Sequence, residues 1–231
     1  MKKIFAAVAA ILCSAGAVFA QQTIRSDKVS WFNTVSLTGK LAVELIPSDT
    51  NRINIELKDT DITKLEWGVT DSVLTVKLRP GGVSPKGSAV VVIHYRVLDD
   101  LRVNGAEVKT QDTLAGGMMS IDLSGGAKLT ATVKCQDLDL KLSGNSAAQM
   151  DGYAKYFTLR AALRSKADAR NLDAQSVTVQ AYSNSELYVD AMERLVAETG
   201  TGGTVFYTGK PQIVKLSTKM GGNIHDIDGK R

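Results

Sequence analysis

Three stretches of this sequence repeat one short phrase: Val103-Asn104-Gly105-Ala106, Leu123-Ser124-Gly125-Gly126 and Leu142-Ser143-Gly144-Asn145. They are separated by 20 and then 19 residues, and weaker copies follow at 161–164, 181–184, 198–201 and 216–219. A constant period of about 20 residues is typical of a solenoid, in which each repeat forms one structural unit stacked on the previous one. The sequence therefore predicts repeated coils over residues 102–231.

Each repeat alternates short apolar stretches with turns, and we interpret it as three short strands per coil. Glycine at the corner fits a sharp turn, because glycine adopts positive φ without steric cost. The predicted fold is an all-β, right-handed parallel β-helix, whereas an antiparallel β-sandwich would not require the same corner phrase every 20 residues. The expected coil starts are Arg102, Asp122, Lys141, Arg160, Gln180, Ala197 and Lys215.

Residues 21–101 lack the corner phrase but are rich in strand patterns. Apolar and polar residues alternate at Val35-x-Leu37 and at Ile53-x-Ile55-x-Leu57, as in half-buried strands. The run from Ala89 to Tyr95 is continuously apolar or β-branched apart from His94, which indicates a strand covered on both faces. We expect this section to be continuous with the stack of coils.

Residues 1–20 have the pattern of a secretory signal peptide. Lys2 and Lys3 precede an apolar run, and Val18-Phe19-Ala20 resembles a cleavage site. The mature chain would carry 26 basic and 24 acidic residues, which is too balanced to predict a nucleic-acid partner. No further segment has the sequence pattern of a transmembrane helix. We therefore expect an exported protein of the periplasm or the cell surface.

The periodic corners resemble those of one family, the head GIN domain of auto-transporter adhesins. The resemblance extends from about Trp31 to Lys219. It implies a right-handed β-helix of Bacteroides-type bacteria, exported and adhesin-like, with no established chemistry. The matching stretches are Asn104-Gly105-Ala106, Ser124-Gly125-Gly126, Ser143-Gly144-Asn145, Thr199-Gly200 and Tyr207-x-Gly209-x-Pro211.

Residues for metal or cofactor chemistry are sparse. His94 and His225 are far apart in the sequence, and the glycine-rich calcium repeat of β-rolls is absent. After removal of the signal peptide, Cys135 is the sole cysteine and is expected to be a small core residue without a histidine base. We predict no metal site, no cofactor and no nucleophile of the serine-hydrolase type.

Three carboxylates recur at equivalent coil positions: Asp112, Asp151 and Asp190, each 39 residues from the next. Two coils correspond to roughly 9.6 Å, a separation compatible with a general acid and a general base. An alternative function is therefore a polysaccharide lyase or hydrolase that uses these three residues. The other interpretation is that aspartate favours turns through local backbone hydrogen bonds.

The preferred hypothesis is a non-enzymatic interaction module that binds a glycan or an envelope protein through a long sheet face. Its candidate ligand-binding residues are Tyr182 and Tyr207, which could stack on sugar rings, and Arg160 and Arg164, which could contact acidic groups. A purely structural envelope spacer is the third hypothesis. Open solenoid ends also predict end-to-end or face-to-face homo-oligomers, unless residues 221–227 cover one end.

Overall fold

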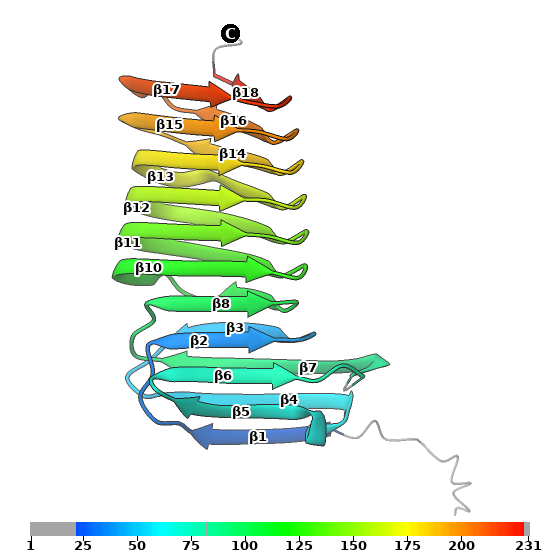
Figure 1. Cartoon of the computed structure of the whole chain (residues 1–231). Helices are drawn as coiled ribbons and strands as arrows, with labels where there is room; N and C mark the ends of the chain where they lie inside the picture. Colours follow the sequence, from blue (N-terminus) through cyan, green and yellow to red (C-terminus); the bar gives the residue numbers. More distant parts are fainter. Residues whose placement is uncertain (1–21, 82, 229–231) are drawn as a thin grey trace, which may run out of the picture.

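The structure, a computed structural model, describes residues 22–81 and 83–228 and confirms a right-handed parallel β-solenoid. In Figure 1 the front strands within residues 100–218 run from left to right, and the chain returns behind them as it climbs. Equivalent residues in successive coils are 18 to 20 positions apart, as in the series Val103, Leu123, Leu142, Ala161, Ala181 and Thr199. The predicted signal peptide lies outside the described residues.

The first half of the chain forms nine strands and one short 3-10 helix. They are β1 (Gln22–Lys28), β2 (Thr34–Thr38), β3 (Ala42–Pro47), β4 (Arg52–Thr60), η1 (Ile62–Lys64), β5 (Leu65–Thr70), β6 (Val73–Leu78), β7 (Val83–Tyr95), β8 (Asp100–Asn104) and β9 (Glu107–Thr110). The second half continues with β10 (Leu114–Ser124), β11 (Lys128–Leu142), β12 (Ala147–Ala161), β13 (Lys166–Ala181), β14 (Glu186–Asp190), β15 (Arg194–Thr199), β16 (Thr204–Thr208), β17 (Ile213–Thr218) and β18 (Asn223–Asp226).

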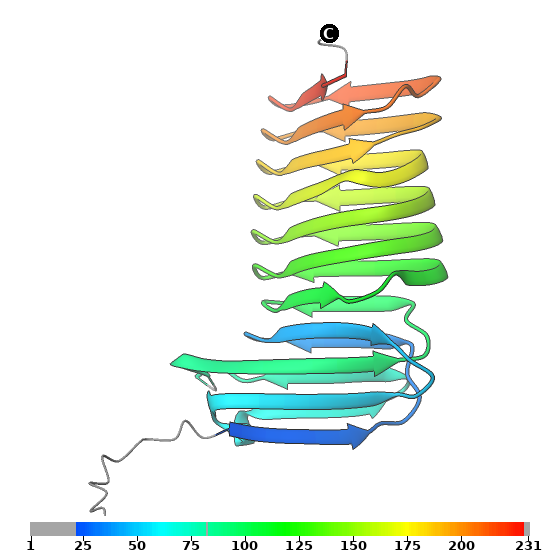
Figure 2. The same cartoon turned by 180° about the vertical axis from the view of Figure 1, so that it is seen from behind.

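Each coil has two arms, so the expectation of three strands per coil is wrong. Strands β11, β12 and β13 are 15 or 16 residues long and bend at their middle without a turn. Their C-terminal halves form the front sheet of Figure 1 with β5, β6, β2, β8, the end of β10, β15 and β17. Their N-terminal halves form the back sheet, which faces the viewer in Figure 2, with β1, β4, β7, β3, β9, β14, β16 and β18.

The corners between the arms are tight four-residue turns. In the regular coils two consecutive residues have positive φ, for example Gly144 and Asn145 at 65° and 63°, and Ser183 and Asn184 at 51° and 60°. At 182–185 the turn closes with a backbone hydrogen bond from Ser185 N to Tyr182 O at 3.1 Å, whereas at 143–146 the Ser146 hydroxyl donates to Ser143 O at 2.7 Å. Two successive positive φ values with this bond define a type I′ turn.

This geometry corrects the coil register near the C-terminus. Gln180 pairs with Glu198, and Glu198 pairs with Ser217, so the expected starts Ala197 and Lys215 are displaced by one and by two residues. The five earlier starts are in register. At the last corners, 200–203 and 219–222, Gly200 and Lys219 take the position of the serine. Thr199 and Ser217, which come before them, resemble the repeated phrase, so the expected starts fell too early.

One apolar core runs through the interior of the stack. Leucine and isoleucine dominate near the N-terminal end, with Leu45, Ile53 and Ile93 fully buried, whereas many C-terminal coils are filled by alanine. Cys135 is part of this core, as expected, and burial raises the pKa of its thiol to about 11. A thiol with so high a pKa is almost entirely protonated at neutral pH and is a poor nucleophile.

The N-terminal section is continuous with the stack, but its coils are not in chain order. The β2–β3 coil lies between the β6–β7 coil and the β8–β9 coil. Below it, β4 pairs antiparallel with both β7 and β1, and β5 pairs antiparallel with β6 (Figures 1 and 2). These antiparallel strands close the N-terminal end of the stack.

The C-terminal end adds one more parallel coil. Strand β17 pairs with β15, and β18 pairs with β16, so residues 223–226 continue the back sheet and do not fold over the end. Among the described residues, no helix is long and apolar enough to cross a membrane.

Candidate functional site

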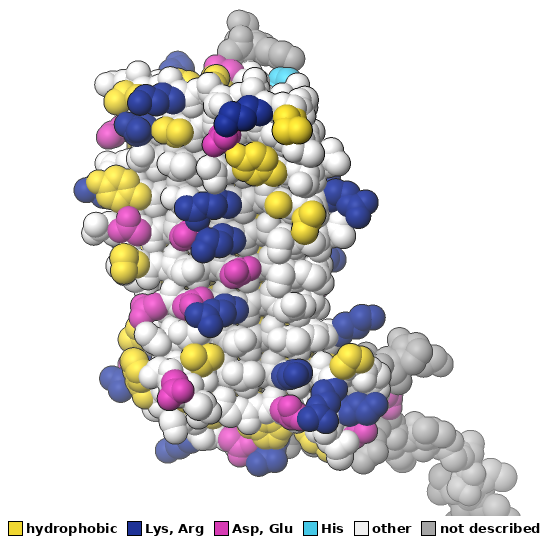
Figure 3. All heavy atoms as spheres, in the orientation of Figure 1, with side chains coloured by type: hydrophobic (Ala, Val, Ile, Leu, Met, Phe, Trp, Pro, Cys, Tyr) yellow, Lys and Arg dark blue, Asp and Glu magenta, His cyan; other side chains and the backbone are white. Residues whose placement is uncertain are grey.

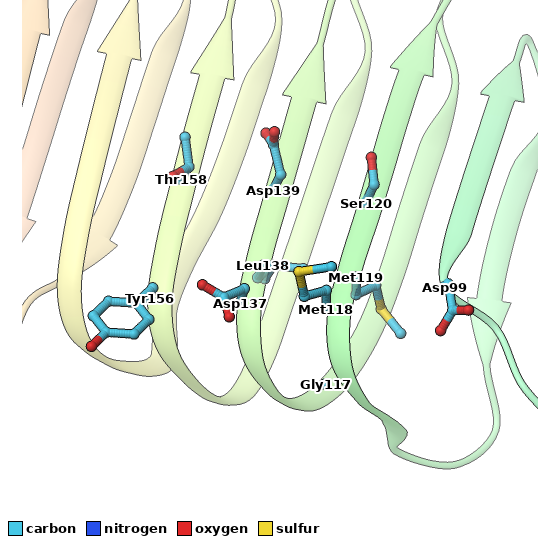
Figure 4. Close-up of a pocket in the computed structure, with 10 residues that line it drawn as sticks. All are labelled: Asp99, Gly117, Met118, Met119, Ser120, Asp137, Leu138, Asp139, Tyr156 and Thr158. Carbon is cyan, nitrogen blue, oxygen red and sulfur yellow. The ribbon is translucent and has the colours of Figure 1, made fainter.

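A groove of about 760 Å³ lies beside the front sheet, where strands β10, β11 and β12 bend (Figure 4). Its lining combines carboxylates and hydroxyls with a thioether and a phenol. The lining residues are Asp99, Gly117, Met118, Met119, Ser120, Asp137, Leu138, Asp139, Tyr156 and Thr158. A volume of this size falls in the range of small-ligand sites.

The groove is built from two rows that run along the solenoid axis. Met118, Asp137 and Tyr156 are paired neighbours on three successive coils and form the first row. Ser120, Asp139 and Thr158 form the second row in the same register. Met118 is 73% exposed and Tyr156 is 45% exposed, so the first row presents apolar surface to solvent. The hydrogen-bonded sheets hold these side chains in place.

The carboxylates of the groove differ in their partners. Asp139 accepts two hydrogen bonds from Arg160 Nη1, at 2.9 and 3.1 Å, and lies 3.7 Å from Lys141 Nζ. Asp99 Oδ2 accepts one hydrogen bond from Asn33 Nδ2 at 2.9 Å. In the part of the chain that the structure describes, Asp137 has no ion pair. The groove therefore retains acceptor capacity on Asp137 and on the second oxygen of Asp99.

Comparison with known proteins identifies the family. The family profile described as "Putative auto-transporter adhesin, head GIN domain" matches residues 31–211. The chain belongs to this head GIN domain family. The coils, the corners and the groove described above lie within the matched residues, apart from strand β1 and the last coil with its corner.

Solved structures share the fold of this GIN domain at low sequence identity. A "putative adhesin" from Bacteroides fragilis has a TM-score of 0.81 at 21% identity, with 88% of this chain and 96% of that chain covered. A "putative adhesin" from Parabacteroides merdae has a TM-score of 0.71 at 16% identity, covering 89% and 97%. A "putative lipid binding protein" from Parabacteroides distasonis has a TM-score of 0.67 at 18% identity, covering 89% and 97%. Among curated proteins, none matches.

The structure does not bring the four predicted ligand-binding residues of the GIN domain together. Arg160 lies at the rim of the groove through its contact with Asp139. Arg164 is an exposed corner residue with φ of 61°, beside a different hollow at the turns. Tyr207 is partly buried and packs against the core.

Tyr182 covers a glycine of the next coil. A Cβ atom added at Gly200 would lie 3.0 Å from its ring, so the ring rests directly on that backbone. Burial raises the pKa of the Tyr182 hydroxyl, with a further contribution from its hydrogen bond to Glu198. Glu198 in turn accepts a hydrogen bond from Lys219 Nζ at 2.9 Å. These contacts link three successive coils.

The three predicted catalytic carboxylates of the back sheet and its bends do not line the groove. Asp112 is exposed in the bend after β9, and Asp151 lies in β12 between Thr132 and Asn171 of the adjacent coils. Asp190 accepts a hydrogen bond from Thr208 Oγ1 at 2.7 Å. Among the described residues, no group of three His, Cys, Asp or Glu side chains could hold a metal ion.

Aromatic side chains form a ladder on the back sheet at the C-terminal coils. Tyr188 stacks on Phe206 at 4.7 Å between ring centroids, and Phe206 stacks on His225 at 5.1 Å. The Arg170 guanidinium lies 4.9 Å from the Tyr188 centroid. Because the ring faces of Tyr188 and Phe206 are covered within the ladder, it ties coils together and offers the edges of these two rings, not their faces, to a ligand.

The corner phrase does not mark the groove, although the sequence carries a signal for it. Met118, Asp137 and Tyr156 are spaced by 19 residues, as are Ser120, Asp139 and Thr158. Applying the period of the corners to the polar and aromatic residues would have placed these side chains in two adjacent rows. On the front face of the molecule, basic and acidic side chains are interspersed (Figure 3), so net charge alone did not mark the site.

Proposed function

We propose that this GIN-domain protein is an exported, non-enzymatic adhesin-like module and that the groove at the bends of β10–β12 binds a glycan. The observation that carries the proposal is the pairing of the two rows. Tyr156 and Met118 offer apolar surface to the C–H faces of a sugar, and the row beside them offers hydroxyl groups and carboxylate acceptors. The family description supports an adhesin-like role.

Rigidity favours binding at this place. Apart from Asp99, which precedes β8, the groove residues lie on the long strands β10–β12, so their backbone positions are set before a ligand arrives and little ordering entropy is lost on binding. Asp137 is the acceptor best placed to receive sugar hydroxyls, because Asp139 is already held by Arg160 and Lys141. The proposed compartment is the periplasm or the cell surface, where such a ligand is accessible.

A glycan array with the purified protein, with and without calcium, tests the proposal. Tyr156→Ala and Asp137→Asn should each weaken binding to a glycan found there by about tenfold, from loss of ring contact and of charge-assisted hydrogen bonds respectively. The matched control is Tyr153→Ala, because Tyr153 is on the same strand but lines a different hollow with Lys134 and Lys155. That control should bind like the wild type.

Other outcomes would redirect the proposal. Release of shorter products from a bound polysaccharide would overturn the non-enzymatic role in favour of a lyase or hydrolase. Selective binding that survives both groove variants would move the site elsewhere on the sheets. An array without any selective binding would contradict a glycan ligand and favour an envelope protein as partner.

A further inference from the structure

The last coil exposes the side chains that should fill the core of a further coil. Val214 is 43% exposed and Leu216 is 49% exposed, whereas their neighbours one coil below, Leu195 and Ala197, are 0% and 1% exposed. Ile224 on β18 is likewise only partly buried above the fully buried Val205. Within the described residues, nothing lies above these apolar side chains.

Among the described residues, one edge of the last coil's strands has no neighbouring strand. Ile213 N donates to Glu193 O and Lys219 N donates to Thr199 O, both in the coil below. Because N–H and C=O groups alternate in direction along a strand, residues 214, 216 and 218 direct theirs to the open side. An exposed strand edge of this kind is a template for pairing with another strand.

The aromatic ladder ends at the same place. Arg170 covers its lower end, and His225 on β18 is exposed at its upper end. Three columns therefore terminate together at the open coil: the core side chains, the strand edges and the stacked rings.

We propose that this end binds the same end of a second copy of the chain, forming a closed dimer. A matching partner must present two strand edges, on two sheets at the same separation, with apolar residues directed inward. The identical end meets this requirement when a two-fold axis runs perpendicular to the sheets, which sets β17 antiparallel to β17 of the other copy. The fold itself tolerates such an addition, since β4 on β7 and β5 on β6 extend the other end antiparallel.

Charge selects the register of the pairing. Inward residues stay inward if either Lys215 or Leu216 lies opposite itself. The first register places two lysine ammonium groups side by side, which is unfavourable. The second sets Leu216 against Leu216 and Lys215 against Ser217, so the apolar side chains meet at the centre of the contact. A dimer of this kind pairs both strand edges of the C-terminal end, and its two-fold symmetry closes the contact so that it does not grow into a filament.

Sedimentation velocity over a concentration series tests the proposal. The wild type should show a reversible monomer–dimer equilibrium, and the double variant Val214→Glu with Leu216→Glu should raise the dimer dissociation constant at least tenfold. Both side chains are exposed in the monomer, so an unchanged circular dichroism spectrum is expected. Val97→Glu is the matched control, because Val97 is 44% exposed between β7 and β8, several coils below this end, and should leave dimerisation unchanged.

Hydrogen exchange supplies a second readout. Amides of residues 214, 216 and 218 should exchange more slowly at dimeric than at monomeric concentration, while those of the β1 edge should not change. A wild type that stays monomeric at all concentrations would overturn the proposal. Association that survives the double variant, or assemblies larger than a dimer, would also overturn it, because these results place the contact elsewhere.

Discussion

The two ends of this solenoid are built in different ways. At the C-terminal end each coil follows the previous one in the chain, all strands are parallel, and the last coil leaves core residues exposed. At the N-terminal end the coils are out of chain order, and antiparallel strands close the stack over fully buried leucine and isoleucine side chains. Regular repetition therefore makes coils easy to add, whereas closing an end requires a departure from the repeat.

The largest effect is expected from removing side-chain volume in the core at each end and comparing the two losses of stability. Ile53 in β4 is fully buried, so Ile53→Ala should lower the free energy of unfolding by about 2–5 kcal/mol. Val214→Ala at the exposed end should cost less than about 1 kcal/mol, because little buried surface is lost. Urea denaturation of the two variants measures both values. Equal losses would show that the ends are equally closed.

Glycines give the second comparison. Gly39, with φ of 101°, follows β2, and a Cβ there would lie 2.3 Å from the Leu78 carbonyl oxygen of the coil below. Gly39→Ala should lower the free energy of unfolding by about 3 kcal/mol, because the new Cβ clashes and the positive φ is unfavourable for alanine. Gly221, with φ of 75°, has no heavy atom within 4 Å of such a Cβ. Gly221→Ala should then lower the free energy of unfolding by only about 1 kcal/mol, because only the positive φ is unfavourable there. Thermal unfolding of both variants would separate the effect of the clash from that of the positive φ. Similar decreases in melting temperature for the two variants would contradict the close packing around Gly39.

A corner of the regular coils allows a substitution that should stabilise the protein. Leu163 and Arg164 occupy the two positive-φ positions of their turn, at 57° and 61°. Replacement by Asn-Gly, the pair favoured in type I′ turns, should raise the free energy of unfolding by about 1 kcal/mol. The control keeps a side chain at the second position, as Leu163→Asn with Arg164→Lys, and should gain less. Urea denaturation in which the Asn-Gly variant is no more stable than the wild type would argue against strain at this corner.

The smallest expected effect concerns acid stability at the C-terminal coils. Hydrogen bonds from Lys219 and Tyr182 lower the pKa of Glu198 below its usual value of 4.5. A depressed folded-state pKa contributes stability above the unfolded value, and this contribution is lost as the pH falls through the folded pKa. Glu198→Gln should therefore be slightly less stable than the wild type at pH 7 and should converge with it in acid. Glu44→Gln, at a carboxylate on β3, is the control, and parallel pH profiles for Glu198→Gln and the wild type would contradict the contact.

The regular coils could be predicted from sequence because the residue types at their corners and in their core recur at the same spacing. Gly125 and Gly144 mark corners at positive φ, and Leu123, Leu142 and Ala161 fill one inward column. Prediction weakened where a corner lost its serine, and it gave a register error near Lys215. The bends in the middle of β11–β13 were read as turns, because a bend without hydrogen-bond closure has no fixed residue signature.

The N-terminal end was less predictable for a physical reason. The alternation Ile53-x-Ile55-x-Leu57 buries one face of a strand, and it is the same for parallel and antiparallel partners. The order of the strands in the chain does not predict their order in the stack, since both neighbours of the β2–β3 coil come later in the sequence. The candidate site was missed because single tyrosines were weighed by residue type and not by their register with Asp137 and Met118.

The displaced position of the β2–β3 coil also constrains the order in which the chain can fold. Residues 34–47 are synthesised before both of their neighbours in the stack, β6–β7 and β8–β9, which come from residues 73–110. These long-range pairings must form before the coil is buried, and such contacts are slow because the intervening chain has to be ordered. Once they exist, each later coil needs only the one just before it. The irregular end is thus the expected rate-limiting part of folding, and the regular coils are expected to add to it in sequence.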